Sequence, residues 1–255
     1  AELAVARGSM APPADAPAGE AAAAAPPRIS AGRRAWRGVL VAGLVGGVLL
    51  VADGVLTIAW QEPVTAFLQD RAQTGLGDDL QALEDEFAAA PAVARETERR
   101  RMRRQASALL RNRDPGEALG RLEIPRMGLR SVVVQSTQAG ALRKGPGHYA
   151  GTVLPGMAGT VGIAGHRTTY GAPFRDIDDL RRGSEIRLRM PYGTFTYKVA
   201  STRITTPDDA SSLRSRAGSD RLVLTACHPL YSAAKRIVVT ATLQRSAPPG
   251  AATPS

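Results

Sequence analysis

The sequence predicts an all-β domain, a barrel or a sandwich, that follows one membrane-spanning helix and a helical linker. Residues 38–60 form a long apolar run, and residues 61–114 are polar and compatible with helix. From residue 115 onward, short strand-like runs are separated by Gly and Pro. Many short strands at this spacing, with little helix between them, are typical of β-barrels and β-sandwiches.

Both ends of the chain are expected to be disordered. Ala and Pro dominate the first 27 residues, with no helical or strand period. We therefore expect residues 1–37 to form a disordered cytoplasmic segment. Residues 246–255 are rich in Ser, Ala and Pro and are expected to form a disordered tail.

The apolar run at residues 38–60 is long enough to cross about 30 Å of hydrocarbon as a helix. The two tryptophans, Trp36 and Trp60, bracket it as an interfacial pair would. Four arginines precede the run: Arg28, Arg33, Arg34 and Arg37. Basic residues stay on the cytoplasmic side, so the N-terminus is expected inside and the chain after Trp60 outside. We interpret residues 38–60 as an uncleaved, single-pass signal anchor in the cell membrane.

Residues 61–114 are interpreted as an extracytoplasmic helical stalk between the membrane and the domain. Pro91 divides them into two helical pieces. The first piece is acidic and the second is rich in arginine. Charge runs are usually solvated, which favours a solvated stalk. Binding of the arginines to anionic wall polymer or lipid headgroups is the alternative.

The predicted β domain covers residues 115–245 and is large enough for one core. The expected strands are 119–124, 131–135, 160–165, 185–190, 194–204, 221–227 and 236–243. The run 185–190 alternates apolar and charged residues, and Pro191-Tyr192-Gly193 after it predicts a hairpin turn. Residues 174–180 are expected to form a short helical turn.

The composition restricts the class of partner. The formal net charge is +10 and the sequence pI is about 10.7, which favours an anionic partner such as a membrane surface or cell-wall polymer. Aromatic residues make up only 4% of the chain and do not alternate with the basic residues, so nucleic acid is not expected. The single cysteine excludes an intrachain disulfide and leaves the redox compartment open.

That cysteine, Cys227, follows a run of strand-like residues. Side chains alternate between the two faces of a strand, so Leu222, Leu224 and Ala226 are expected to face the core. Cys227 then lies on the opposite face together with Thr225. A thiol on that face at a strand end is placed to react. A buried cysteine that acts as a small hydrophobic residue is the alternative.

The histidines and one arginine bear on the chemistry. His166 ends the run Gly162-Ile163-Ala164-Gly165-His166, whose small residues allow another chain to approach closely. His228 follows Cys227 directly and should point to the opposite face. Arg236 begins the last strand, nine residues after Cys227, so a return strand would place it beside the thiol. Three histidines and one cysteine match no common zinc spacing, and no metal or cofactor is expected.

These residues resemble the sortase family, and most of all the class E sortases of actinobacteria. The resemblance rests on the order His166, Cys227, Arg236, on Leu-Thr-Ala-Cys-His-Pro around the thiol and on Ala-Gly-His-Arg around the histidine. It covers residues 119–243, including Leu-Glu-Ile-Pro at 122–125 and Gly-Pro-Gly-His-Tyr at 145–149. The family pattern before the cysteine is Thr-Leu-x-Thr-Cys, and here Val223 and Ala226 replace both threonines.

The resemblance implies an eight-stranded β-barrel and a membrane-anchored cysteine transpeptidase. Cys227 would attack the Thr–Gly amide of a Leu-Ala-x-Thr-Gly or Leu-Pro-x-Thr-Gly sorting signal, His166 would protonate the leaving amine, and Arg236 would stabilise the oxyanion. An amine of a peptidoglycan precursor would then resolve the acyl-enzyme. The implied partners are surface proteins that bear sorting signals. The implied substrate-binding residues are Tyr149, Thr225 and Ala226.

Two other functions stay open. A pilus-assembling sortase is one, although such enzymes usually have a lid and a second, C-terminal span. A non-catalytic, membrane-tethered module that binds the cell wall through its arginines is the other. Papain-like proteases place Cys before His in the chain, which is the reverse of the order here. The Ser-His-Gly-Cys signature of L,D-transpeptidases is absent.

Overall fold

The computed structural model describes residues 31–59, 63–90, 96–215, 218 and 220–249. The predicted disorder of residues 1–37 and 246–255 therefore lies mostly outside the described residues, as does Trp60. Within the described part, residues 31–37 belong to a helix and residues 246 and 247 to the last strand. The chain divides into two compact units, residues 1–48 and 49–255.

The first helix, α1 (Ala31–Ala59), contains the predicted apolar span. Its segment Ala35–Leu56, 22 residues long, is apolar and long enough to cross a membrane. Its large apolar side chains are exposed, as lipid-facing side chains would be. Length and composition thus agree with a membrane anchor or a signal sequence.

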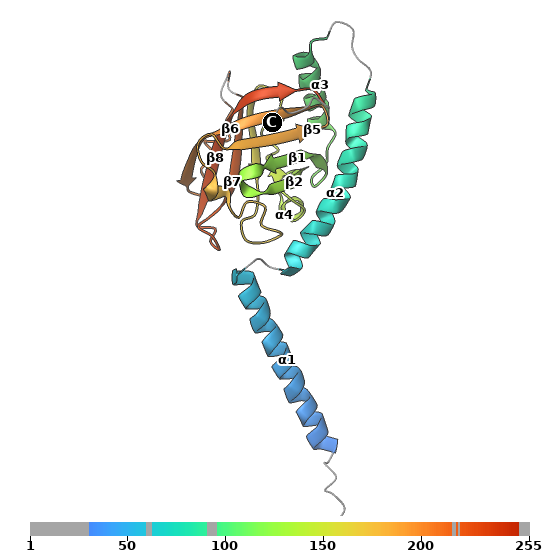
Figure 1. Ribbon diagram of the computed structural model, residues 1–255, viewed down its shortest axis with the longest axis vertical. Coiled ribbons are helices and arrows are strands. Elements are labelled where there is room, and N and C mark those ends of the chain that lie inside the picture. The colour runs from blue at the N-terminus through green and yellow to red at the C-terminus, as the bar shows by residue number, and fades with distance from the viewer. Residues whose placement is uncertain (1–30, 60–62, 91–95, 216–217, 219, 250–255) are drawn as a thin grey trace, which may run out of the picture. The chain divides into compact units, whose positions relative to one another are not determined.

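Two further helices, α2 (Pro63–Ala89) and α3 (Glu98–Arg111), lie in the region interpreted as a stalk. In Figure 1, α2 runs beside the barrel near β1 and β2. One side of each helix is part of the hydrophobic core. The residues concerned, each at most 5% exposed, are Leu76, Leu80, Leu83, Met102, Ala106 and Leu109. The structure therefore differs from a solvated stalk, because these two helices pack onto the β domain.

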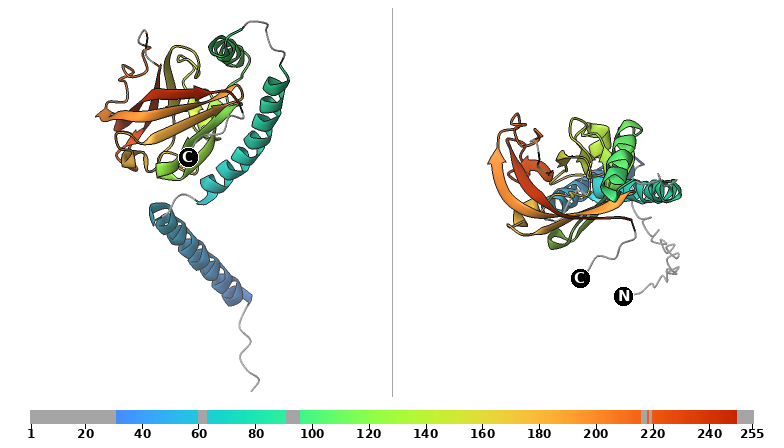
Figure 2. Two further views of the ribbon diagram at one scale, coloured as in Figure 1. Left: turned by 45° about the horizontal axis from the view of Figure 1, so that its top comes forward. Right: turned by 90° about the horizontal axis from the view of Figure 1, so that it is seen from above.

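Eight strands close into a barrel in the order β1-β2-β3-β4-β7-β8-β6-β5, which confirms the predicted all-β fold. The strands are β1 (Ala118–Ile124), β2 (Leu129–Gln135), β3 (Gly147–His148), β4 (Gly159–Ala164), β5 (Glu185–Met190), β6 (Gly193–Thr205), β7 (Asp220–His228) and β8 (Lys235–Ala247). Short helices η1 (Pro125–Met127), α4 (Ala139–Leu142) and η2 (Ile177–Asp179) lie between strands. The long strands β6 and β8 curve together around one side of the barrel (Figure 2).

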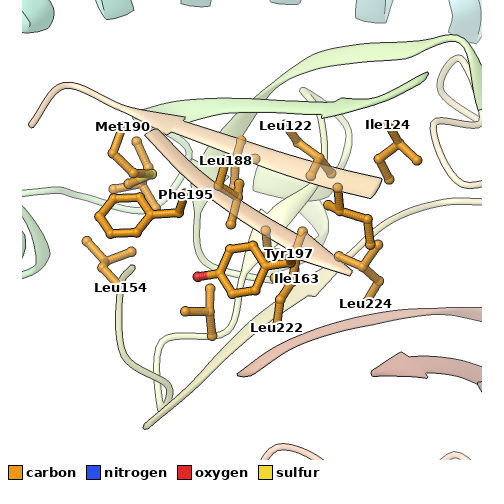
Figure 3. Close-up of a cluster of buried hydrophobic side chains, with 14 of the residues drawn as sticks. Leu122, Ile124, Leu154, Ile163, Leu188, Met190, Phe195, Tyr197, Leu222 and Leu224 are labelled. Carbon is orange, nitrogen blue, oxygen red and sulfur yellow. The ribbon is translucent and has the colours of Figure 1, made fainter. Parts of the chain in front are cut away.

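The core fills the inside of the barrel, as the strand alternation predicts. In β5 the side chains of Ile186, Leu188 and Met190 point inward and are at most 6% exposed. Figure 3 shows side chains from β1, β4, β5, β6 and β7 meeting in this core. Leu222 and Leu224 of β7 are fully buried there. The inner face of β7 is thereby fixed, and its other face must point out of the barrel.

The outer face of β7 is covered over most of its length, which the alternation alone does not predict. Val223 and Thr225 are 0% and 7% exposed. The loop between β6 and β7 crosses the adjoining strand β4, where the Thr160 backbone N–H donates to the Ser215 hydroxyl over 3.3 Å. Exposure is confined to the two ends of β7, and at the C-terminal end Cys227 and His228 are partly exposed.

Candidate active site

Three adjoining strands place the predicted site residues at one end of the barrel. β4 runs parallel to β7 with Ala164 opposite Thr225, and the Gly165 N–H extends this ladder by donating to the Thr225 carbonyl over 3.0 Å. His166 and Cys227 each follow two residues further along these paired strands. β7 and β8 are antiparallel, and Cys227 is directly opposite Arg236. The three side chains thus come from the ends of β4, β7 and β8.

Cys227 is the one free thiol of the chain and is partly exposed. It is the next-to-last residue of β7 and lies on the face opposite to the core residues Leu224 and Ala226. The thiol is therefore reachable from outside the barrel. A substituent on this sulfur would extend away from the core.

Arg236 is held by the turn that joins β7 to β8. Its Nη1 donates to the carbonyls of Ala233 and Lys235, both over 3.0 Å. Among the described residues, its Nε and Nη2 have no partner. The guanidinium is thus fixed on one side while two donor groups stay available, which suits a donor aimed at a developing negative charge.

His166 lies just past the end of β4 and is held by its backbone. Its carbonyl accepts a hydrogen bond from the Phe174 N–H over 2.9 Å. The Phe174 ring lies against Gly165, where a Cβ would come within 2.6 Å of the ring, so glycine is needed for this close approach. Burial, and then the positive charge of Arg143, lower the pKa of His166. The neutral imidazole is therefore the favoured form at neutral pH, and it can accept a proton.

The His148 ring is buried and hydrogen-bonded, which indicates a structural role. It is 1% exposed, and its ring nitrogens are bonded to Gln135 Oε1 at 2.9 Å, to Thr152 Oγ1 at 3.0 Å and to the Val153 carbonyl at 3.2 Å. Burial lowers the pKa of His148 to about 4. It is therefore neutral at physiological pH and bonds the β3 region to β2.

His228 belongs to a separate cluster built on a buried arginine. Arg167, 4% exposed, donates to the carboxylate of Asp178 over 2.7 Å and to the Arg175 carbonyl over 2.9 Å. Its Nη1 lies 3.4 Å from His228 Nδ1. Because Arg167 follows His166 and His228 follows Cys227, this contact joins the ends of β4 and β7. The His228 ring is engaged by Arg167 rather than by the thiol.

The substrate-binding residues implied by the resemblance lie in two places. Tyr149 and Thr225 meet on the outer face, with their hydroxyl oxygens 2.9 Å apart. Ala226 is 3% exposed and belongs to the core cluster. Its methyl group faces the barrel interior, so only its backbone is placed to touch a substrate outside the barrel.

Sequence reasoning missed several residues around His166. Tyr170 packs on His166 with ring centroids 5.2 Å apart, and Arg143 lies 5.7 Å from the centre of the Tyr170 ring. Arg167 is the last residue of the Ala-Gly-His-Arg motif, but its burial was missed, since buried arginines are rare. The one available signal was Gly171, which indicates a tight turn shortly after the histidine.

Among the described residues, no three His, Cys, Asp or Glu side chains gather as metal ligands would.

A thiol, an imidazole and a guanidinium at one end of a closed barrel have the composition of a cysteine acyl-transfer site. The family model of the Sortase domain matches residues 122–244. The solved structure of sortase E from Streptomyces avermitilis is 34% identical with a TM-score of 0.50, and the match covers 56% of this chain and 97% of that one.

Two relatives found by sequence similarity are also named as sortases. Sortase D of Bacillus subtilis is 36% identical over 129 residues, and sortase SrtE1 of Streptomyces coelicolor is 32% identical over 141 residues. Each match covers 49% of this chain, with 64% of the length of the first relative and 40% of the second. The chain belongs to the sortase family, whose members are cysteine transpeptidases.

Proposed function

We propose that this chain is a membrane-anchored transpeptidase that cleaves a sorting signal of the Leu-Ala-x-Thr-Gly or Leu-Pro-x-Thr-Gly type between Thr and Gly. The acyl group passes through a thioester on Cys227 to an amine of the cell wall. The observation that supports this most directly is the strand register. Cys227 is opposite Arg236, and His166 follows the strand that adjoins β7.

In the first half-reaction, neutral His166 accepts the proton of the Cys227 thiol as the sulfur attacks the threonine carbonyl. The S–C bond forms and the carbonyl oxygen becomes negative. His166 then gives its proton to the glycine nitrogen as the C–N bond breaks. The proton thus moves from sulfur to the leaving amine, and the thioester remains on Cys227. The lowered pKa of His166 suits its role as proton acceptor.

In the second half-reaction, the wall amine attacks the thioester. The new C–N bond forms, the C–S bond breaks, and His166 moves the proton of the amine to the sulfur. Arg236 stabilises the oxyanion in both halves, because it is directly opposite Cys227 in the strand register and shares the sheet face of the thiol. This role is electrostatic, since a guanidinium is not deprotonated in proteins.

The sorting signal binds at the Cys227 end of the outer face of β4 and β7, against the partly exposed Tyr149, whose hydroxyl contacts the buried Thr225. Their hydroxyl contact places an aromatic ring and two polar groups two residues before Cys227 along β7. An extended peptide that presents its scissile bond to the sulfur passes this pair. We assign Tyr149 and Thr225 to substrate binding, and we assign Ala226 to it only through its backbone.

The helix α1 anchors the enzyme, with the β domain outside the cytoplasm. The apolar segment Ala35–Leu56 and the arginines before it support this orientation. A wall-linking enzyme requires that its active site and its amine acceptor are in the same compartment.

The test uses the full chain in nanodiscs with peptides that contain either signal and with small amines as acceptors. We expect cleavage between Thr and Gly, an amine-dependent product, and an acyl-enzyme that mass spectrometry locates on Cys227. Cys227→Ala is the matched control and should be folded and inactive. Iodoacetamide should abolish turnover, whereas a wall-binding module would keep its affinity. Cleavage by the alanine variant would contradict the mechanism.

A further inference from the structure

The loop that follows His166 has an unfavourable backbone. Three consecutive residues have positive φ: Tyr170 at 49°, Gly171 at 65° and Ala172 at 43°. Glycine adopts this conformation freely, but a non-glycine residue does so only at a cost in backbone strain. A loop of this kind keeps its shape only where its surroundings hold it.

The start of α2 holds this loop. The backbone N–H of Tyr170 donates to the hydroxyl of Thr65 over 3.1 Å, across 105 residues of chain. One helical turn later on the same side of α2, Gln69 lies against Gly171, where an added Cβ would collide with the Gln69 side-chain oxygen. Gln69 is 6% exposed. The two α2 side chains thus rest on the backbone of the two successive left-handed residues.

Held in this way, Tyr170 covers His166. Its ring lies 5.2 Å from the His166 ring at an angle of 42°, and the Arg143 guanidinium lies 5.7 Å from the Tyr170 ring centre. Tyr170 therefore contacts both the imidazole and the cation that acts on it. Other titratable or charged groups at this end of the barrel include Arg167 and its partner Asp178, Cys227 and His228 on β7, and Lys235 and Arg236 on β8.

We propose that Tyr170 is a positioning residue for His166, and that Thr65 and Gln69 of α2 hold Tyr170 in its place. Through this contact, the segment that directly follows the membrane span supports the catalytic histidine. The inference rests on the proposed role of His166 in catalysis. It adds that the proton-transfer geometry depends on residues about 100 positions earlier in the chain.

Two consequences follow from the geometry. Removal of the Tyr170 ring admits water to His166, and because burial is the main cause of its lowered pKa, that pKa must rise. The imidazole also loses its lateral support. A small displacement of a catalytic group lowers turnover by on the order of 10- to 100-fold. A residue with only a structural role would not change the pKa of one particular histidine.

The experiment uses the full chain in micelles. Tyr170→Ala, Tyr170→Phe and Thr65→Val are compared with wild type, and Thr74→Val is the matched control because Thr74 bonds only within α2, to the Asp70 carbonyl. Turnover and KM are measured with the sorting peptide. The His166 pKa is measured by NMR of labelled histidine in the Cys227→Ala background. The chain has only three histidines, and single substitutions of His148 and His228 assign their signals.

We expect Tyr170→Ala to raise the His166 pKa and to lower turnover by at least about tenfold, with a smaller change in KM. Tyr170→Phe, which keeps the ring, should have a His166 pKa and a turnover close to those of wild type. Thr65→Val, which is isosteric, should also raise the His166 pKa, and it should lower turnover by about fivefold. Thr74→Val should change neither the pKa nor the turnover. Thr65→Val decides the outcome where Tyr170→Ala does not fold.

The failure of this inference and the failure of the proposed function are distinguishable. An unchanged His166 pKa and unchanged turnover in Thr65→Val and Tyr170→Ala, in an enzyme that His166→Ala inactivates, would overturn the role of Tyr170 alone. An enzyme that stays active after His166→Ala or Cys227→Ala would instead overturn the proposed mechanism.

Discussion

Cys227 of β7 and Arg236 of β8 are direct partners in an antiparallel ladder, nine residues apart along the chain. Residues paired in this way have Cβ atoms about 4.5–5.5 Å apart and point to the same face. The hairpin therefore fixes the spacing between the Cβ atoms of Cys227 and Arg236 without help from the rest of the barrel. Any reaction at the sulfur takes place within reach of Arg236.

Arg236→Ala should lower turnover by about a hundredfold or more, because one preorganised oxyanion donor contributes roughly 3 kcal/mol. Lysine keeps the charge but loses the planar fork, so Arg236→Lys should recover little activity. The fold should be retained, since Arg236 is partly exposed and bonds only to its own turn. Steady-state kinetics with circular dichroism check both points. Turnover within about threefold of wild type, under 1 kcal/mol of barrier, would refute the electrostatic role.

The three histidines should respond differently to substitution. His166→Ala should abolish turnover, whereas His228→Ala, which removes a contact to Arg167, should keep a substantial part of it. His148→Ala removes a buried, bonded ring, and its effect should appear as lost stability rather than as lost turnover of the folded fraction. Specific activity corrected for folded protein makes the comparison. Equal losses at all three positions would mean that His166 has no special role.

Strand alternation and residue order were enough to predict most of the barrel. The run at 185–190 is an observed strand with the predicted bounds, and the β7 core face is as expected. The strand β3 was missed because it is two residues long, too short for any period to show. The packing of α2 was missed although its buried leucines, Leu76, Leu80 and Leu83, lie at helical spacing. Many charged residues surround these leucines, and such charge runs are usually solvated.

The surroundings of the candidate site were less predictable than its chemistry. The order of His166, Cys227 and Arg236 can be read from the sequence. Strand ends and a hairpin then explain why the three residues come together. The contact between Thr65 and Tyr170 joins residues 105 positions apart, and no local pattern encodes it. Whether a long polar side chain such as that of Arg167 is buried depends on the final packing of several loops.

Gln73 is expected to be a main attachment of α2 to the barrel. Its side-chain nitrogen donates to the carbonyls of Val132 and Lys144, and its oxygen accepts from the Val132 N–H over 2.7 Å and from the Ser131 hydroxyl over 3.0 Å. Gln73→Ala leaves these groups without a partner and should lower the free energy of unfolding by about 2 kcal/mol.

Gln81→Ala is the matched control, since Gln81 bonds only to Asp85 on the exposed side of the same helix. Urea denaturation should show a change within about 0.5 kcal/mol for this control. Equal stabilities of the two variants would mean that the Gln73 hydrogen bonds do not contribute to the attachment of α2.

The orientation of the chain in the membrane is tested with intact protoplasts. The arginines before the apolar segment Ala35–Leu56 predict that the N-terminus lies inside, so added protease should digest the β domain. An N-terminal tag should stay protected until the cells are lysed. Protection of the β domain in intact cells would reverse the topology and would separate the enzyme from its wall substrates.

His148 should make the stability of the domain depend on pH. Its pKa is about 4 in the folded state, against an ordinary value of 6.5. Between these two values the unfolded chain binds a proton at this histidine and the folded chain does not. The free energy of unfolding must therefore fall as the pH falls from 6.5 toward 4, by about 3 kcal/mol in all. Above pH 6.5 both states are neutral at this position, and His148 contributes no slope.

The measurement is urea denaturation at several pH values between 4 and 7 for wild type and His148→Gln. The variant lacks the titrating group, so the difference between the two curves isolates His148 from the carboxylates that also titrate in acid. His228→Gln is the control for the loss of a histidine at a partly exposed position. Parallel curves for wild type and His148→Gln would show that the buried imidazole accepts a proton in the folded state. Its bonds to Gln135, Thr152 and the Val153 carbonyl would then have to rearrange at acid pH.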